Sequence, residues 1–177
     1  MMVKKHMNKD KRKTIEGWIE KASNHLQVAT EHSKSFNRHS EAIEAAQECV
    51  DLSVKSILSL LDVQYSRSHE WAPDKKEFAA IAQQIREREL LDKLARQHLE
   101  HTGRLPRLLF LLNFWAQFYI TAKYGFEVEH LASARDLFNK EEAELAVHHA
   151  EECHRAASQL RYLNEDKLSA LVSRETA

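Results

Sequence analysis

Apolar residues recur every three or four positions along most of the chain, which is the period of an amphipathic α-helix. The pattern predicts helices over residues 15–30, 40–61, 74–101, 105–124 and 140–163. Asp74 and Asn139 stand at the start of two of these helices, and each has a glutamate three residues later, the pattern of a capping box. Thr14 is the expected N-cap of the first helix, and Gly103 is the expected stop of the third.

Two of the predicted helices have unusual apolar faces. Residues 105–124 carry large apolar side chains on almost every side, and a helix of this kind must be central to the core or buried in an interface. This segment is the main argument from the sequence for a homodimer. The last helix has a narrow seam of mostly small residues, which permits another helix to approach closely. The seam consists of Ala146, Ala150, Cys153, Ala157 and Leu160.

The composition also favours helices. The 177 residues include 3 glycines and 2 prolines, too few turn formers for many hairpins. We expect an all-α fold of about five helices. One helical domain is predicted over residues 14–165, between a flexible basic arm at residues 1–13 and a charged tail at residues 166–177. The arm is either a solvated tail or a segment that contacts nucleic acid.

Charge and cysteine content limit the class of protein. Basic and acidic residues number 26 and 27, so any site for an anion must be a local patch. Cys49 and Cys153 lie on apolar stripes, which predicts reduced thiols in a cytoplasmic protein and not a disulfide. Polar residues interrupt the longest apolar run, and the N-terminus has no signal-type segment, so neither secretion nor a membrane span is expected.

No cofactor and no metal ion are predicted. Glycine-rich phosphate loops and zinc-finger spacings are absent from the sequence. His149 and Cys153 have a metal-ligand spacing of four residues, and Glu151 with His154 forms one Glu-x-x-His pair. The second pair that a di-iron site needs is missing. Cys153 falls on the apolar seam, and a hydrated helix face is the better explanation of His149, Glu151, Glu152 and His154.

A second group of polar residues lies on and after the long helix at residues 40–61. Asp51 and Lys55 are four residues apart and therefore share one face of that helix, and His69 follows in a polar connector. One interpretation is an exposed ion pair worth about 0.3–0.5 kcal/mol beside a histidine that caps a helix. The other is a half-buried ligand site near the bundle axis.

These features, taken in order along the chain, resemble the HEPN family of small all-helical proteins. The residues that carry the resemblance are Trp18, Ala22 and Leu26 in the first helix, Asp51 and Lys55 in the second, His69 in the loop, Lys123-Tyr124-Gly125 after the apolar helix, and Asn139 before the last helix. The acidic member is more often glutamate in the family, and the basic residue at Lys123 is more often arginine.

The resemblance implies an up-and-down antiparallel bundle, a homodimer, and a cleft of polar residues from the central helices. We expect Asp51, Lys55, His69, Lys123 and Tyr124 to bind a nucleotide or RNA. The expected function is that of a binding or interaction module, for which the resemblance suggests a nucleotidyltransferase partner in a toxin-antitoxin or defence system.

The alternative function is enzymatic. Some HEPN proteins are metal-independent endoribonucleases with an arginine followed at a short spacing by a histidine, and Arg96 and His101 match that spacing. Arginine would hold the scissile phosphate and histidine would transfer a proton. Gln97 departs from the usual motif, and a chain with eleven histidines can contain one such spacing by chance. A helical scaffold without either activity is the third alternative.

Overall fold

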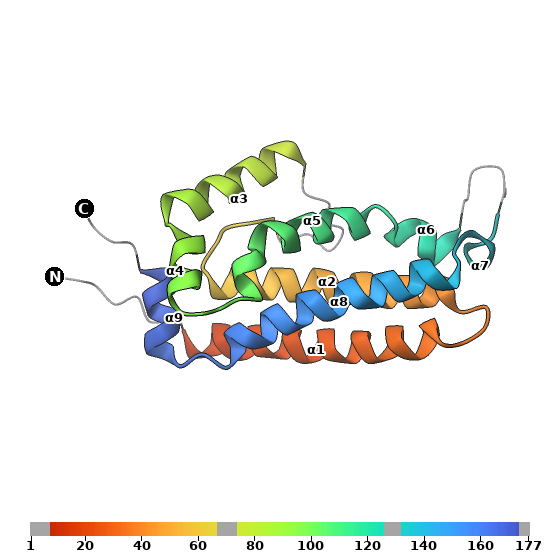
Figure 1. Ribbon diagram of the computed structural model, residues 1–177, viewed down its shortest axis with the longest axis horizontal. Coiled ribbons are helices and arrows are strands. Elements are labelled where there is room, and N and C mark those ends of the chain that lie inside the picture. Colours follow the sequence, from red (N-terminus) through yellow and green to blue (C-terminus); the bar gives the residue numbers. More distant parts are fainter. Residues whose placement is uncertain (1–7, 67–73, 126–131, 174–177) are drawn as a thin grey trace.

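The computed structural model describes residues 8–66, 74–125 and 132–173, and Figure 1 shows how their helices are arranged. The elements are α1 (Lys9–Ser33), α2 (His39–Leu60), α3 (Lys75–Glu87), α4 (Leu90–Arg96), a short 3-10 turn η1 (Thr102–Arg104), α5 (Leu105–Ala116), α6 (Tyr119–Tyr124), α7 (Ala134–Leu137), α8 (Lys140–Arg161) and α9 (Glu165–Val172). The all-α fold predicted from the sequence is confirmed.

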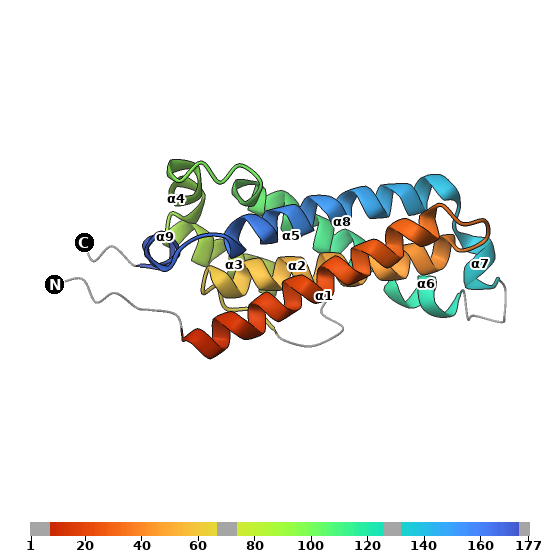
Figure 2. The same cartoon turned by 90° about the horizontal axis from the view of Figure 1, so that it is seen from below.

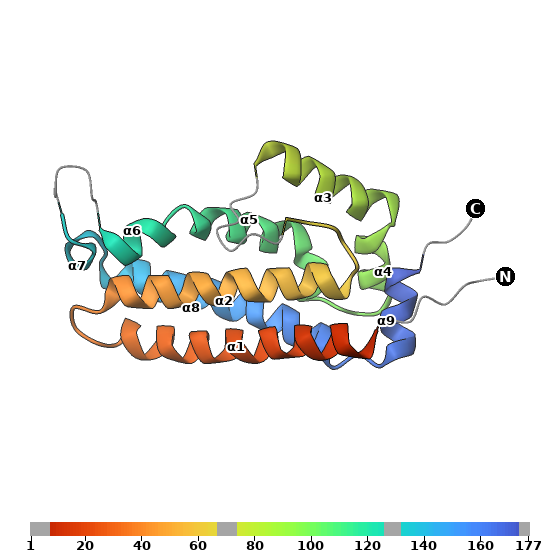
Figure 3. The ribbon, with the colours of Figure 1, turned by 180° about the vertical axis from the view of Figure 1, so that it is seen from behind.

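The main body is an up-and-down bundle with α2 at its centre. Helices α1, α2, α8 and the consecutive pair α5 and α6 lie side by side, and the chain direction alternates from one to the next in sequence (Figures 1 and 3). Helix α2 contacts α1, α8, α5 and α6. This central position explains why α2 is the most completely buried helix in the described part of the chain.

Helix α2 packs against the small seam of α8. All five seam residues are fully buried, as the pattern of small side chains predicts. The Sγ atom of Cys49 on α2 lies 3.7 Å from the carbonyl oxygen of Ala150 on α8. Cys49 and Cys153 are both free and buried, which agrees with the predicted absence of a disulfide. Burial raises the pKa of the Cys49 thiol to about 12, so it is inert at neutral pH.

Helices α3, α4 and α9 gather at the end of the bundle where α1 begins (Figure 2). The sequence predicted a single helix over residues 74–101, and this prediction is wrong. Its capping box of Asp74 and Glu77 is present, but the helix ends at Glu87 and a new one begins at Leu90, with Glu89 left-handed at φ 49°. The break lets Leu90 and Leu94 turn into the core.

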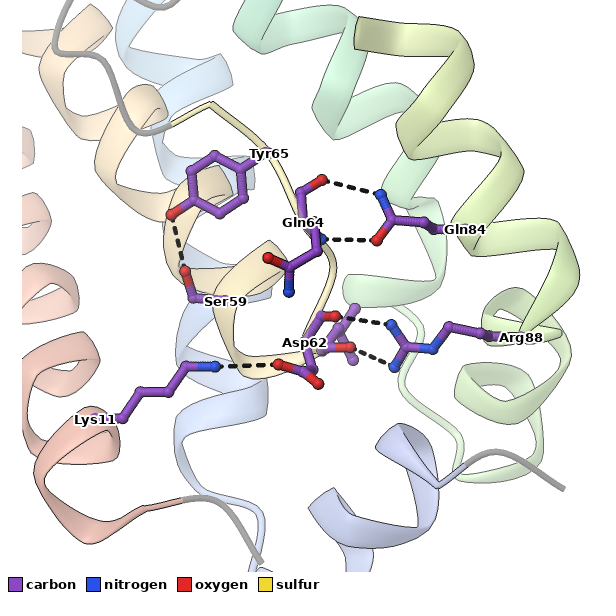
Figure 4. Close-up of polar contacts among 8 residues, drawn as sticks. Lys11, Ser59, Asp62, Gln64, Tyr65, Gln84 and Arg88 are labelled. Carbon is purple, nitrogen blue, oxygen red and sulfur yellow. Dashed lines mark hydrogen bonds and ion pairs between the residues drawn. The ribbon is translucent and has the colours of Figure 1, made fainter. Parts of the chain in front are cut away.

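A set of long-range hydrogen bonds holds this break in place (Figure 4). The guanidinium of Arg88 donates to the carbonyl oxygens of Leu61 at 2.6 Å and Asp62 at 3.0 Å, at the end of α2. The side-chain amide of Gln84 exchanges two hydrogen bonds with the backbone of Gln64. These contacts join α3 to the turn after α2, and no local sequence pattern contains them.

The first helix begins earlier than predicted. Its N-cap is Asn8 and not Thr14, whose hydroxyl instead donates to the carbonyl of Asp10 within the helix. Residues 9–13, predicted as part of a flexible arm, form the first turns because they are anchored. Lys11 pairs with Asp62 at 3.2 Å (Figure 4), and the side chain of Arg12 donates to two carbonyls at the end of α8. Residues 1–7 lie outside the described part of the chain.

Three further predictions need correction. Gly103 does not stop a helix, because it lies in η1, which continues directly into α5. Residues 105–124 form two helices, α5 and α6, and not one. Residues 165–172 form α9, which buries Leu168 and Leu171 and therefore replaces most of the predicted charged tail. None of the described helices is both long enough and apolar enough to cross a membrane.

Candidate functional site

The ion pair between Asp51 and Lys55 lies inside the protein. The Nζ atom of Lys55 donates to Oδ2 of Asp51 at 2.7 Å, and each residue is 8% exposed. Gln47 and Ser59, each four residues away along α2, are buried as well. We call these four residues the polar row of α2. A buried charge pair is costly to desolvate, so the interpretation as an exposed surface ion pair is wrong.

His69 was predicted to join this pair. It lies outside the described residues, so its convergence with Asp51 and Lys55 remains a prediction.

Lys123 and Tyr124 lie at the exposed end of α6. The ammonium group of Lys123 donates to the hydroxyl of Tyr119 at 3.3 Å and stands 5.4 Å and 5.5 Å from the ring centres of Tyr119 and Tyr124. The hydrogen bond to Tyr119 raises the pKa of Lys123 above its usual value. Gly125 ends this helix at φ 81°, where an added Cβ would lie 2.6 Å from the backbone nitrogen of Ala134. The sequence Lys-Tyr-Gly therefore has a geometric reason for its glycine.

Asp51 and Lys55 lie in the buried row of α2, whereas Lys123 and Tyr124 are exposed at the end of α6. The acidic residue of α2 whose charge acts on Lys123 is Glu44, and Asp51 comes seven residues later. At about 1.5 Å of rise per residue, the two positions are roughly 10 Å apart along the helix. Asp51 is buried and Lys123 is exposed, so the bundle separates a polar interior row from a cationic surface group.

A residue with left-handed backbone conformation lies between Arg96 and His101 in the chain. Arg96 is the last residue of α4, and His98 between the two is left-handed at φ 56°. Arg96 is exposed and His101 is partly exposed. Neither side chain forms a hydrogen bond or ion pair with any residue that the structure describes, so both are accessible to a ligand.

A polar cluster between α5 and α8 was not predicted as a site. Arg107 forms a two-pronged pair with Glu152, through Nε at 2.8 Å and Nη2 at 2.9 Å. Arg104 reaches the same carboxylate at 3.2 Å. Hydrogen bonding from Arg107 lowers the pKa of Glu152, whose side chain is only 14% exposed. The predicted hydrated face of α8 is therefore wrong at this position.

The contact between α5 and α8 also fixes the orientation of the imidazole ring of His149. The indole Nε1 of Trp115 donates to Nδ1 of His149 at 3.1 Å, which leaves the imidazole proton on Nε2. Burial, followed by the charge of Arg107, lowers the pKa of His149. Cys153 lies in the core and cannot turn toward a shared ion. Within the described ranges, no group of three or more side chains is placed to bind a metal.

One sequence signal pointed to this cluster. Arg107 is a charged residue within an otherwise apolar run, and a charge in that position needs a partner. The partner lies forty-five residues away on another helix, so spacing along the chain does not reveal it.

Comparison with known proteins places the chain in a family. The HEPN domain model matches residues 15–160, which include the first helix almost entirely and extend to the end of α8. Searches of curated proteins and of solved structures gave no significant match. The match covers most of the chain and agrees with the helical bundle, and the chain therefore belongs to the HEPN domain family.

Proposed function

We propose that this HEPN protein is a module that binds a nucleotide or RNA, with Lys123 and Tyr124 as contacts to the ligand. The observation that carries the proposal is the exposed ammonium group of Lys123 beside the rings of Tyr119 and Tyr124. An ammonium group attracts phosphate, and an aromatic ring provides a face on which a base can stack. The 56% exposure of Tyr124 leaves its ring accessible.

Asp51, Lys55 and His69 belong to the proposal as a second set of ligand-binding residues. The ion pair is built into the central helix at 2.7 Å and is nearly closed to solvent. A buried charged pair is a weak source of stability, so retention for specificity or ligand binding is a reasonable hypothesis.

Binding can be tested with a panel of nucleotides and a labelled RNA. We expect Lys123→Gln to weaken binding about fivefold or more, since one charged phosphate contact is lost. Lys140→Gln is the matched control, because the side chain of Lys140 is 62% exposed and forms one helical ion pair on a different helix. Equal affinity of wild type and Lys123→Gln would remove Lys123 from the site. A ligand-induced rise in Tm that His69→Ala abolishes would support the second set of residues.

We also propose that the protein is a homodimer and that it acts with a nucleotidyltransferase. Large apolar side chains that are about half exposed support an interface on the described surface, and they include Ile120 and Leu145. A light-scattering mass of one chain at micromolar concentration would contradict the dimer. Failure of a co-expressed nucleotidyltransferase to bind would contradict the partner.

The second candidate function is that of a metal-independent endoribonuclease that uses Arg96 and His101. The observation in its favour is that both side chains are accessible and unengaged by described residues. Arg96 would clamp a phosphate, and His101 would move a proton between the attacking hydroxyl and the leaving oxygen. Cleavage of a mixed-sequence RNA in EDTA should be lost in Arg96→Ala and in His101→Ala. Arg86→Ala and His98→Asn change exposed residues and are the matched controls, because asparagine tolerates the left-handed backbone of His98.

A further inference from the structure

We propose that the outer face of α5 binds single-stranded RNA, with phosphates at Arg104 and Arg107 and bases against Phe110 and Phe114. We call these four residues the α5 face. This inference rests on the proposed function, and it adds a site that the sequence analysis did not include. Arg107, Phe110 and Phe114 are three and four residues apart and therefore follow one side of the helix.

The cationic end of the α5 face consists of two guanidinium groups held by one carboxylate. Arg107 and Arg104 both approach Oε1 of Glu152, at 2.8 Å and 3.2 Å. Two positive charges and one negative charge leave a net positive site. A guanidinium has five N–H donors, and Arg107 uses two of them on Glu152. The side chains remain 39% and 58% exposed, so both retain donors that a phosphate can reach.

The aromatic end has two accessible rings on a fixed support. Phe110 is 58% exposed and Phe114 is 36% exposed, and their ring centres lie 6.0 Å apart at an interplanar angle of 26°. Phe114 meets the buried ring of Trp115 edge-on at 5.1 Å. This contact restricts the motion of Phe114, so less entropy is lost when a base stacks on it. Accessible rings beside cations are the usual elements of a single-strand binding surface.

The local charge fits a polyanion. No aspartate or glutamate occurs from His101 to Gly125, although the segment contains Arg104, Arg107 and Lys123. A strand that lies along the α5 face would therefore meet two guanidinium groups at one end and two aromatic rings at the other.

A second copy of the chain is a weaker candidate for this face. A symmetric dimer places the same patch of both copies in contact, which would bring Arg104 and Arg107 toward their own equivalents. In each copy the carboxylate of Glu152 already pairs with both arginines. A phosphate backbone supplies the missing negative charge, whereas a second copy adds positive charge.

The test is fluorescence anisotropy with a labelled single strand of about ten nucleotides and with its duplex. We expect the single strand to bind more tightly than the duplex. Phe110→Ser and Arg104→Gln should each raise Kd for the strand about fivefold or more. Phe36→Ser and Arg38→Gln are the matched controls, because Phe36 is 88% exposed, the Arg38 side chain is 53% exposed, and both lie in or beside the turn before α2. Circular dichroism checks that each variant is folded.

Each outcome has a separate meaning. If wild type binds the strand and all four variants match it, the α5 face is overturned and the proposed function stands. If wild type binds neither strand nor nucleotide, both proposals fail. If Phe110→Ser halves the light-scattering mass without a change in Kd, the face is an interface between copies and the inference is overturned.

Discussion

Helix α2 and the pair α5 and α6 depart from the usual pattern in opposite directions. The central helix α2 buries a charged pair, Asp51 and Lys55, where apolar side chains are expected. Helix α5 exposes Phe110 on the surface, where polar side chains are expected. Buried polar groups and exposed apolar groups are the most informative deviations, because packing alone does not produce them. The interior of the bundle therefore contains an unexpected polar row on α2, and its surface contains unexpected exposed aromatic rings on α5.

The largest expected effect comes from breaking the buried pair. Lys55→Met removes the ammonium group that pairs with the buried carboxylate of Asp51 at 2.7 Å, and we expect the free energy of unfolding to fall by about 3 kcal/mol or more. Denaturant titration measures it. The matched control is Lys140→Met, which removes an exposed pair of the same spacing and should cost less than about 0.5 kcal/mol. Equal losses in the two variants would contradict the burial of the pair.

The next effect concerns the packing of α8 on α2. Ala150→Leu adds three carbon atoms at a fully buried position where the backbone carbonyl approaches Cys49, and overpacking of this kind costs about 1–3 kcal/mol. Leu145→Ala on the same helix changes a side chain that is 46% exposed and should cost well under that. Thermal denaturation of both variants measures the difference. A tolerated Ala150→Leu would show that the two helices are not closely packed.

The sequence predicted the helices better than their ends. The capping boxes at Asp74 and Asn139 were predictable because both partners lie within three residues. The break at Glu89 was not, because Arg88 is fixed by carbonyls that precede it by more than twenty residues. Helix α9 was missed because it follows a charged stretch and buries only two side chains, Leu168 and Leu171, which the core at the end of the bundle stabilises.

The residues of the candidate site also differ in how far the sequence alone predicts them. The pair of Asp51 and Lys55 was predictable from a spacing of four, but its burial depends on the helices packed around α2 and could not be predicted. The Lys-Tyr-Gly segment gave a local cue for Lys123. The cluster of Arg107 and Glu152 had no such cue, because its members are on different helices.

A smaller effect on thermal stability is expected from protonation of His149, at the boundary between α5 and α8. Burial lowers the pKa of His149 below its usual value of 6.5, so the unfolded chain takes up this proton more readily than the folded one. The stability that the neutral His149 contributes is fully present above pH 6.5, and it is lost as the pH falls through the lowered pKa of this imidazole in the native state. We expect Tm to decrease from about pH 7 to about pH 5, and His149→Gln to make that decrease shallower. Burial lowers the pKa of His25 and His154 also, so some slope should remain.

The control for this prediction is His148→Gln, which changes the exposed neighbour of His149. It should change the slope of Tm against pH less than His149→Gln does, because the charge of His148 is the smallest of the causes that shift the pKa of His149. A slope that His149→Gln does not alter would mean that protonation of this imidazole is no harder in the folded protein than in the unfolded chain.

The smallest expected effect on stability belongs to a residue that is expected to contribute to binding. Phe110 is 58% exposed, so Phe110→Ser should change the free energy of unfolding by no more than about 0.5 kcal/mol. Denaturant titration beside Phe36→Ser gives the comparison. A loss as large as that for Lys55→Met would mean that Phe110 is a structural residue, and the contrast between α2 and α5 would disappear. A stable Phe110→Ser that binds RNA weakly would instead assign its exposed ring to the ligand, because a side chain that contributes little to folding would then contribute to binding.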